Sequence, residues 1–458
     1  MRYRYRKDDE LKDSGVEWIG KIPKDWETLK LKRITQSVKN GIWGDDEQHN
    51  SDDIQCIRIL NFDRNKMQVN IDDLTVRNIP KEKQKGYLLN KGDLLIEKSG
   101  GGEKNPVGFV AIYNHTLPAV YANFMAKISL NDKADSSYIR YICSNIYNKR
   151  IHMDSVNQTT GIQNLDTERY FSRVIAIPNI KEQEKIANFL DKKTSQFDSI
   201  ISKKEKLIER LQEAKKILIS EVVTGKVKVV KTDDGYELIK RSSEDMKDSG
   251  VEWLGEIPKD WDITKLKYIG EAITGLTYSP NDIVDENEGT LVLRSSNVQN
   301  GRIVLNDNVY VNMNIPEKLI TREGDIIICS RNGSRALIGK NACIGSNDAG
   351  KSFGAFMTVF RSKYYEYLNF VFNSHIFKAQ SGSFLTSTIN QLTIGNLNSF
   401  IIAIPNEKEQ EIIVKYLCNK TLKYNSIVDK LKEQIEKLKE AKQSLISEAV
   451  TGKIEILD

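Results

Sequence analysis

The sequence lacks the patterns of a disulfide-rich, zinc-binding or membrane-spanning protein. Its 458 residues include five cysteines without C-x-x-C spacing and four histidines without H-E-x-x-H spacing. Neither a disulfide framework nor a zinc site is therefore predicted. No apolar run approaches the ~20 residues of a membrane helix, and the first residues, MRYRYRKDDE, lack the apolar core of a signal peptide. These absences predict a cytoplasmic protein with reduced thiols.

Catalytic signatures are also missing. GSRALIGKN, from Gly333, resembles a phosphate loop, but the spacing of its glycines is one residue too long and Asn341 stands where Ser or Thr would hold a metal. Asp93 and Glu97 are close in sequence, but Cys329 replaces the second carboxylate at the matching place further along. No N-P-P-[FY] methyltransferase motif occurs. We therefore expect a binding protein with no catalytic residue, bound cofactor or metal.

A long internal repeat organises the chain. KDSGVEWIGKIPKDWETLKLK, from Lys12, returns as KDSGVEWLGEIPKDWDITKLK, from Lys247. IAIPNIKEQEKI and EAKKILISEVVTGKV, from Ile175 and Glu213, return later as IAIPNEKEQEII and EAKQSLISEAVTGKI. A repeat of this length is too long for a solenoid unit. It predicts two homologous domains, each large enough to bury its own core.

Each copy ends in a Lys/Glu-rich stretch without Gly or Pro, from about residue 181 to 224 and from about 408 to 451. This composition favours a long helix. A solvated surface helix is one interpretation, but apolar residues at heptad spacing in both stretches favour a seam along which the helices pair. If each helix leaves an equivalent domain in an equivalent direction, the pair is antiparallel. The predicted seam residues are Ile186, Leu190, Phe197, Ile200, Leu207, Leu211, Leu218, Ile413, Leu417, Tyr424, Ile427, Leu431, Leu438 and Leu445.

The two bodies between the repeated segments share a mixed α/β frame but differ in their polar loops. GDLLIEK, from Gly92, and GDIIICS, from Gly324, are matching strand-like runs. SGGGEKNPVG follows the first run, whereas RNGSRALIG follows the second. RILNFDRN, from Arg58, likewise faces RSSNVQNG, from Arg294, and QTTGIQNL, from Gln158, faces LTSTINQL. This pattern is typical of two related modules that read two different ligands.

The repeated start segment, the IAIPN-KEQEKI junction and the EAKK-LISEVVTGK ending resemble the specificity subunit of type I restriction-modification systems. The resemblance covers almost the whole chain. It implies two target recognition domains that each read one half of a bipartite double-stranded DNA target. It also implies conserved helices that set the spacer and dock two modification (methyltransferase) subunits, with restriction (ATPase/nuclease) subunits in the full complex. S-adenosylmethionine, ATP and magnesium then belong to partner subunits, and none is bound by this chain.

The predicted fold class is therefore α+β. Two homologous mixed α/β target recognition domains lie in a pseudo-twofold arrangement, separated by two long antiparallel coiled-coil helices. The expected boundaries are target recognition domain 1 at 1–180, the first long helix at 181–225, a linker at 226–246, target recognition domain 2 at 247–407, the second long helix at 408–452 and a tail at 453–458.

Loops rich in base-reading side chains are the candidate DNA contacts. Arg recognises guanine and Asn or Gln recognises adenine in the major groove, whereas Lys, Ser and Thr hold phosphates. In the first domain the candidates are Arg58, Asn61, Lys98, Ser99, Lys104, Gln158, Thr159, Thr160, Gln163 and Asn164. In the second they are Arg294, Ser295, Asn297, Arg331, Asn332, Arg335, Ser387, Thr388, Asn390 and Gln391. For any single residue, a solvated loop or a hydrogen bond within a turn is the alternative.

The repeated tryptophans have a different expected role. Trp18, Trp26, Trp253 and Trp261 recur together with Pro and Gly, which favours packing of each domain against a helix over stacking on bases.

Two other functions stay open at this level. One is a non-catalytic coiled-coil scaffold whose flanking domains bind protein, and the other is a self-sufficient nuclease or methyltransferase. A net charge of +5 permits a DNA partner without requiring one. A salt-dependent affinity for duplex DNA would separate DNA binding from the scaffold.

Overall fold

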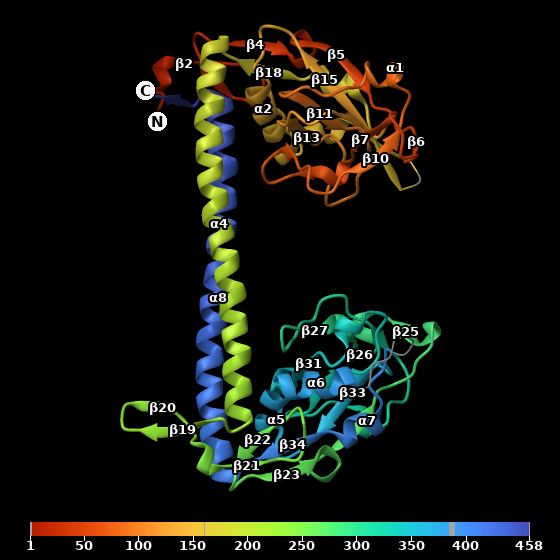
Figure 1. Ribbon diagram of the computed structural model, residues 1–458, viewed down its shortest axis with the longest axis vertical. Coiled ribbons are helices and arrows are strands. Elements are labelled where there is room, and N and C mark those ends of the chain that lie inside the picture. Colours follow the sequence, from red (N-terminus) through yellow and green to blue (C-terminus); the bar gives the residue numbers. More distant parts are fainter. Residues whose placement is uncertain (1, 160, 384–389, 458) are drawn as a thin grey trace. The chain divides into compact units, whose positions relative to one another are not determined.

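The computed structural model describes residues 2–159, 161–383 and 390–457, which fall into two compact units. Unit 1 comprises Met1–Glu205 with Lys432–Asp458, and unit 2 comprises Lys206–Leu431. Each unit holds one mixed domain and parts of the two long helices α4 (Ile180–Val223) and α8 (Glu407–Val450) (Figure 1). Domain 1 here denotes residues 2–179, and domain 2 denotes residues 242–406. None of the described helices has the length and apolar character of a membrane span.

Domain 1 is built on two main sheets. A six-stranded sheet has the order β5 (Thr35–Asn40), β15 (Met125–Leu130), β11 (Asp93–Glu97), β13 (Val110–Tyr113), β9 (Gln68–Val69), β8 (Phe62–Asp63). A four-stranded sheet has the order β14 (Ala119–Tyr121), β7 (Asp53–Ile57), β10 (Thr75–Asn78), β6 (Asp45–Asp46). The apolar run at the centre of β11 is fully buried because α2 (Ser136–Asn148) also packs against this strand.

A third sheet of domain 1 is formed by polar segments. Its order is β12 (Ser99–Gly100), β17 (Ile162–Leu165), β16 (Val156–Thr159). Two short helices, α1 (Lys81–Gln84) and α3 (Thr167–Phe171), complete the domain.

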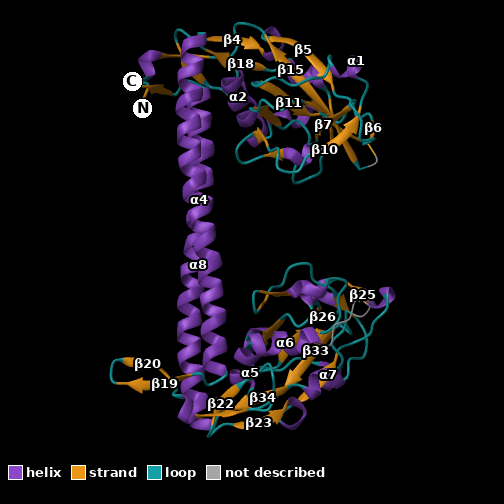
Figure 2. Cartoon of the chain, in the orientation of Figure 1, coloured by secondary structure: helices purple, strands orange, loops and turns teal. Residues whose placement is uncertain are grey.

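Domain 2 repeats this frame in shorter form (Figure 2). Its sheets have the orders β24 (Glu271–Thr274), β33 (Met357–Arg361), β30 (Ile326–Cys329), β31 (Asn341–Cys343) and β25 (Ile283–Val284), β29 (Tyr310–Val311), β26 (Thr290–Leu293), β32 (Ser352–Phe353). The strand β30 lies between β31 and β33, as β11 lies between β13 and β15. The pair β26 and β32 is parallel, as is the pair β7 and β14. A hairpin of β27 (Val298–Gln299) and β28 (Arg302–Ile303) and the helices α5 (Tyr365–Phe372), α6 (His375–Ser383) and α7 (Ile394–Ser399) complete it. The repeated frame is confirmed.

The repeated start segment makes the same strand pairs in both domains. In domain 1 these are β2 (Leu11–Asp13) with β3 (Lys21–Pro23), and β4 (Glu27–Lys30) with β18 (Val174–Ile177). In domain 2 they are β21 (Met246–Asp248) with β22 (Glu256–Pro258), and β23 (Asp262–Lys265) with β34 (Ile401–Ile404). The second pair joins the start of each domain to the strand that leads into a long helix.

The start segment also packs against the glycine that ends a long helix. Gly452 follows α8 with a φ of +71°, and a Cβ built there would lie 2.3 Å from Cδ of Pro23. The same contact occurs in unit 2, where a Cβ on Gly225, at φ +72°, would lie 2.3 Å from Cγ of Pro258. Trp26 and Trp261 are buried beside these glycines. These two tryptophans therefore have the expected packing role.

The long helices pair antiparallel in both units. In unit 1 the Lys204 ammonium donates to Gln434 at 2.7 Å, and Lys442 donates to Asp198 at 2.7 Å. Residue numbers therefore rise along α4 as they fall along α8, as Figure 1 also shows. In unit 2 Lys215 and Asn425 form the corresponding contact at 2.8 Å.

The structure corrects one of the two heptad positions of the predicted seam, which lies one residue further along each helix. Ile200, Leu207 and Ile427 are 43, 44 and 46% exposed. Their successors Ile201, Ile208 and Val428 are better covered. The other predicted seam residues are buried or half-buried: Ile186, Leu190, Phe197, Leu211, Leu218, Ile413, Leu417, Tyr424, Leu431, Leu438 and Leu445.

The error arose because polar residues occupy part of the seam. Thr194 and Lys442 are buried at positions that carry no apolar signal in the sequence. Because these two residues are polar, the sequence did not show which of two adjacent heptad positions is buried. The exposed Ile200, Leu207 and Ile427 therefore fitted the heptad spacing as well as the residues that follow them.

Two segments expected to be a linker and a tail form matching ribbons. In unit 2, β19 (Val227–Thr232) and β20 (Gly235–Lys240) make a hairpin that follows α4 (Figure 1). In unit 1, β35 (Ile454–Ile456) follows α8 and pairs with β1 (Tyr3–Tyr5). Ile454 faces Tyr5, as Val227 faces Lys240, so both ribbons have the same register relative to the helix.

The lysine of each helix pair has a different acceptor in the two units. Lys442 is buried, and its ammonium donates to both carboxylate oxygens of Asp198 and, at 2.8 Å, to the carbonyl of Asn65 in domain 1. Lys215 has the neutral amide of Asn425 instead. Burial, and secondly the charge of Arg302, lower the pKa of Lys215. The positive charge of Lys215 in unit 2 is therefore less well compensated than that of Lys442 in unit 1.

The substitution Asn425→Asp is expected to raise the free energy of unfolding by about 1 kcal/mol at pH 7, because a carboxylate is a stronger acceptor for an ammonium group than an amide. The depressed pKa of Lys215 means that the unfolded chain holds this proton more firmly, so wild-type stability rises with pH near that pKa. The benefit of the substitution should therefore fall as Lys215 loses its charge. Urea denaturation at pH 7 and at alkaline pH measures both effects.

The matched control is Asp198→Asn in unit 1, which removes the carboxylate from Lys442 and should lower the urea midpoint. If Asn425→Asp left the urea midpoint unchanged at pH 7, solvent would already compensate the positive charge of Lys215.

Candidate nucleic-acid interface

Three loops of domain 1 that carry predicted DNA contacts lie together. Ser99 pairs with Asn164 in the β12–β17 ladder, and the Ser99 hydroxyl donates to Oδ1 of Asn164 at 2.6 Å. A Cβ on Gly100 would lie 3.9 Å from Cδ1 of Ile59, which places the loop after β7 beside this ladder. The segments after β7, after β11 and in the β16–β17 hairpin therefore form one surface.

The equivalent loops of domain 2 also meet. The Asn332 amide, after β30, donates to the hydroxyl of Ser295, after β26, at 3.3 Å. Arg331 forms an isolated antiparallel bridge with Gln391. The Asn390 amide donates to the carbonyl of Gly333 at 3.2 Å. The same three places in the fold thus bring the predicted residues together in both domains.

Three predicted base readers are buried amides, and this part of the prediction is corrected. Asn61 accepts a hydrogen bond from the Arg58 backbone at 2.8 Å, and Asn297 accepts one from the Arg294 backbone at 2.9 Å. Gln163 is buried, and its Oε1 lies 3.3 Å from the Val107 backbone N–H, which donates to it. The amides of Asn61 and Asn297 stabilise turns, and that of Gln163 holds the loop before β13 against β17. The Arg-x-x-Asn spacing is repeated because the turn requires it.

The other predicted residues differ in how free their side chains are. Arg294 is engaged, since its guanidinium donates to the Asp307 carboxylate at 2.8 Å. The Lys98 ammonium donates to Asn40 at 2.7 Å. Arg335 is exposed and donates to the carbonyl of Gly382 at 3.4 Å. The exposed group further includes Lys104, Gln158, Asn164 and Arg331, and Arg58, Asn390 and Gln391 are half-buried.

Four candidates lie partly or wholly outside the described residues. Thr160, Ser387 and Thr388 lie outside them entirely. Thr159 belongs to β16, but its side chain is outside the description. Their DNA contacts stay predictions.

Sequence reasoning missed an exposed phenylalanine beside these loops in each domain. Phe124 is 53% exposed and Phe356 is 57% exposed. The backbone carbonyl of Phe124 accepts from Lys98 and Ser99, and that of Phe356 accepts from Ser330 and Arg331. The shared dipeptide Phe-Met in YANFM and FGAFM was the available signal.

Glu97, one of the two carboxylates noted in the first half, has a structural role. Glu97 is buried at the end of β11 and forms an ion pair with Arg64 at 2.6 Å. Burial raises the pKa of Glu97, and the Arg64 guanidinium opposes this rise. Arg64 in turn covers the ring of Phe109 with 4.7 Å between the guanidinium carbon and the ring centroid. The Glu97–Arg64 ion pair is therefore part of the packing of domain 1.

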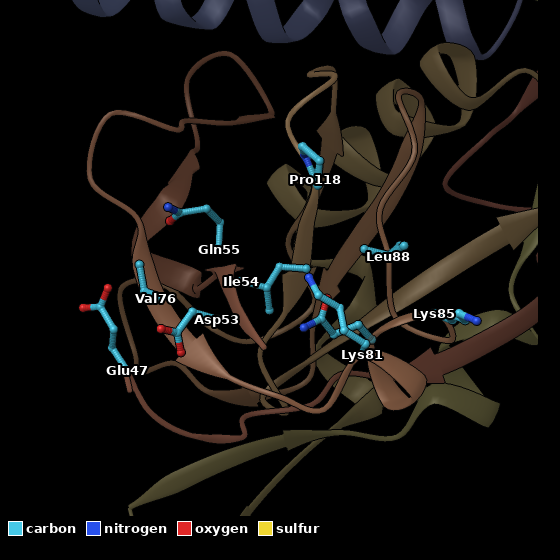
Figure 3. A pocket seen from close by; sticks show the side chains of 10 residues that line it. Glu47, Asp53, Ile54, Gln55, Val76, Lys81, Lys85, Leu88 and Pro118 are labelled. Atoms are coloured by element: carbon cyan, nitrogen blue, oxygen red, sulfur yellow. The ribbon is translucent and has the colours of Figure 1, made fainter. Parts of the chain in front are cut away.

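An open pocket of about 620 Å³ in domain 1 lies apart from the predicted residues, none of which lines it (Figure 3). Its lining mixes acidic and basic groups, among them Glu47, Asp53, Lys81 and Lys85. Glu47, His49 and Asp53 could present ligand atoms within 4.8 Å of one another. The Asp53 carboxylate already accepts from Gln48, Asn50 and Asn78, so it serves to close its own loop.

The fold and the loops define a protein with two related binding domains that present different polar side chains from the same frame. The family model for the type I restriction modification DNA specificity domain matches residues 23–210 and 258–437, so the chain belongs to this family.

Two curated relatives and one solved structure illustrate the similarity. The putative type I restriction enzyme MjaX specificity subunit of Methanocaldococcus jannaschii is 26% identical over 96% of both chains. The type I restriction enzyme EcoKI specificity subunit of Escherichia coli is 26% identical over 44% of both chains. A solved chain from work on complex assembly and conformational transition of the type I R-M system has a TM-score of 0.66 at 15% identity, with 94% of this chain and 99% of that chain covered. The last match supports the fold.

Proposed function

We propose that this chain is the DNA specificity subunit of a type I restriction-modification complex, in which each domain reads one half of a bipartite duplex target. One observation carries the proposal: equivalent loops present Lys98, Ser99 and Asn164 in domain 1 but Arg331, Asn332 and Gln391 in domain 2. A purely structural frame would have no reason to vary these polar loop positions while keeping the strands and turns. The family membership supports the same function.

The side chains on the two surfaces suit different readings of the major groove. An exposed Arg such as Arg331 has the forked donors that match guanine, whereas the amide of Asn164 matches adenine. Exposed basic residues such as Lys104 and Arg335 suit phosphates, which position the protein without reading sequence. The two domains would therefore read two different half-sites.

The remaining activities of the complex belong, in this proposal, to partner chains. Two modification subunits dock on the paired helices, whose length sets the spacer between half-sites, and restriction subunits join the full complex. Those partner subunits bind S-adenosylmethionine, ATP and magnesium, and this chain contributes recognition without catalysis. We also propose a cytoplasmic location, which the proposed action on cellular DNA supports.

Exchange of one domain tests the proposal. Replacing residues 25–178 with the corresponding part of another family member should change one half-site and leave the other half-site and the spacer unchanged, because each domain has its own core. Methylome sequencing of cells that express the chimaera with its modification subunits reads the result. If both half-sites changed together, or neither did, the two-reader model would be wrong.

The scaffold alternative is tested separately with the purified complex. Binding to duplex DNA that weakens steeply with salt supports DNA recognition, whereas a lack of duplex binding would favour the scaffold.

A further inference from the structure

A short turn presents one exposed phenylalanine in each domain. We name it the Phe turn: residues 121–125 (YANFM) in domain 1 and residues 353–357 (FGAFM) in domain 2. Each turn joins a strand of one main sheet, β14 or β32, to a strand of the other, β15 or β33. Within the turn, the backbone of Met125 donates to Ala122 at 3.1 Å, and that of Met357 donates to Gly354 at 2.8 Å.

The backbone around both Phe turns is held by the same contacts. Ala122 donates to the carbonyl of Ile57 at 2.9 Å, and Gly354 donates to that of Leu293 at 3.0 Å. A glycine then packs directly on each turn: a Cβ on Gly41 would lie 2.2 Å from the Ala122 carbonyl oxygen, and a Cβ on Gly275 would lie 2.3 Å from that of Gly354. The turn is therefore a fixed part of the frame.

The exposed ring contrasts with this fixed backbone. Ala122 and Gly354, inside the turns, are buried, but the Phe124 and Phe356 side chains are more than half exposed. An apolar ring kept in solvent at the same place in two divergent domains has no packing role within its own domain that would account for it.

Candidate DNA contacts adjoin the backbone of Phe124 and the ring of Phe356. The Phe124 carbonyl accepts from the Lys98 backbone at 2.8 Å and from the Ser99 backbone at 3.1 Å. The Arg331 guanidinium carbon lies 5.2 Å from the centroid of the Phe356 ring. If Arg331 reads one base pair, the next base pair in the duplex would therefore lie close to Phe356.

We propose that Phe124 and Phe356 contact the C5-methyl group of a thymine, one in each half-site. This inference rests on the proposed function and adds an apolar contact to the polar readers. The thymine methyl is the apolar group that the major groove exposes, and Phe is among the side chains that contact it. A cation–π contact of the Arg331 guanidinium with the Phe356 ring uses the face of the guanidinium and leaves its N–H donors free to bind an adjacent guanine.

The test compares thymine with deoxyuridine, which lacks only the methyl group. The assembled complex with its modification subunits is titrated with duplexes of its own target, in which each thymine of the half-sites is replaced singly by deoxyuridine. We expect one position in each half-site at which the replacement weakens wild-type binding about 3- to 10-fold, the effect of losing roughly one buried methyl contact. At other positions the replacement should have little effect.

The variants connect each methyl group to its ring. Phe356→Ala should weaken binding to the thymine duplex and abolish the preference for thymine at one position only, in the half-site read by domain 2. Phe124→Ala should do the same in the other half-site, so each variant is the control for the other. Both rings are exposed, and equal melting temperatures of variant and wild type confirm an intact fold.

Two results would overturn the inference while the proposed function stands. One is specific binding that neither Phe variant changes, and the other is a variant that weakens binding but keeps the full preference for thymine over deoxyuridine, as an aromatic wedge or a protein contact would. A half-site without any A·T pair would also overturn it for the domain concerned. Failure of the complex to prefer its methylated motif over unrelated duplex would instead overturn the proposed function.

Discussion

The substitution Gly452→Ala is expected to lower the free energy of unfolding by about 2–5 kcal/mol, the largest stability change among our predictions. Two costs combine at this position. Gly452 ends α8 in the left-handed region, at φ +71°, where a side chain is strained. A Cβ would also lie 2.3 Å from Pro23 and 3.3 Å from Trp26, which is fully buried. Gly225→Ala should behave likewise in unit 2, against Pro258.

Gly15 separates these two costs. Its φ is +69°, but nothing lies within 4 Å of a Cβ built there. Gly15→Ala should therefore show the backbone strain alone, about 1–2 kcal/mol. The difference between the Gly452 and Gly15 variants in urea denaturation measures the packing of the start segment on the helix end. Equal losses would mean that Pro23 moves aside freely.

The substitution Arg331→Ala is expected to cost about 1–3 kcal/mol of DNA-binding free energy and to relax preference at one base pair. Arg331 is exposed, follows the buried strand β30 and is held by a backbone hydrogen bond to Phe356 at 3.0 Å. It is freer than Arg294, whose guanidinium donates to Asp307. Competition binding against duplexes that vary one base pair at a time measures the change.

Arg331→Lys is the matched control because it keeps the positive charge but loses the forked donors. It should retain affinity for unrelated duplex while losing the preference at the same base pair. A uniform loss across all sequences in Arg331→Ala, restored by Arg331→Lys, would identify a phosphate contact instead.

The candidate site was predictable at the level of loops but not of single side chains. Residue types and their divergence between the copies located the three loops that the structure brings together in each domain. They did not separate Asn61 and Asn297, which are buried in turns, from exposed residues such as Asn164. The same residue types cap turns and read bases, and only burial distinguishes the two uses.

The internal repeat, the α+β frame and the two long helices followed from the sequence alone, because repeated segments and helix-forming composition are properties of the local chain. The phase of the seam did not, since the buried Thr194 and Lys442 resemble solvent-facing residues in the sequence. The pairing of β1 with β35 and the packing of Trp26 against Gly452 join segments from opposite ends of the chain. Such contacts depend on which surfaces meet after folding, so the tertiary structure alone decided which polar residues are buried and which remain free to bind.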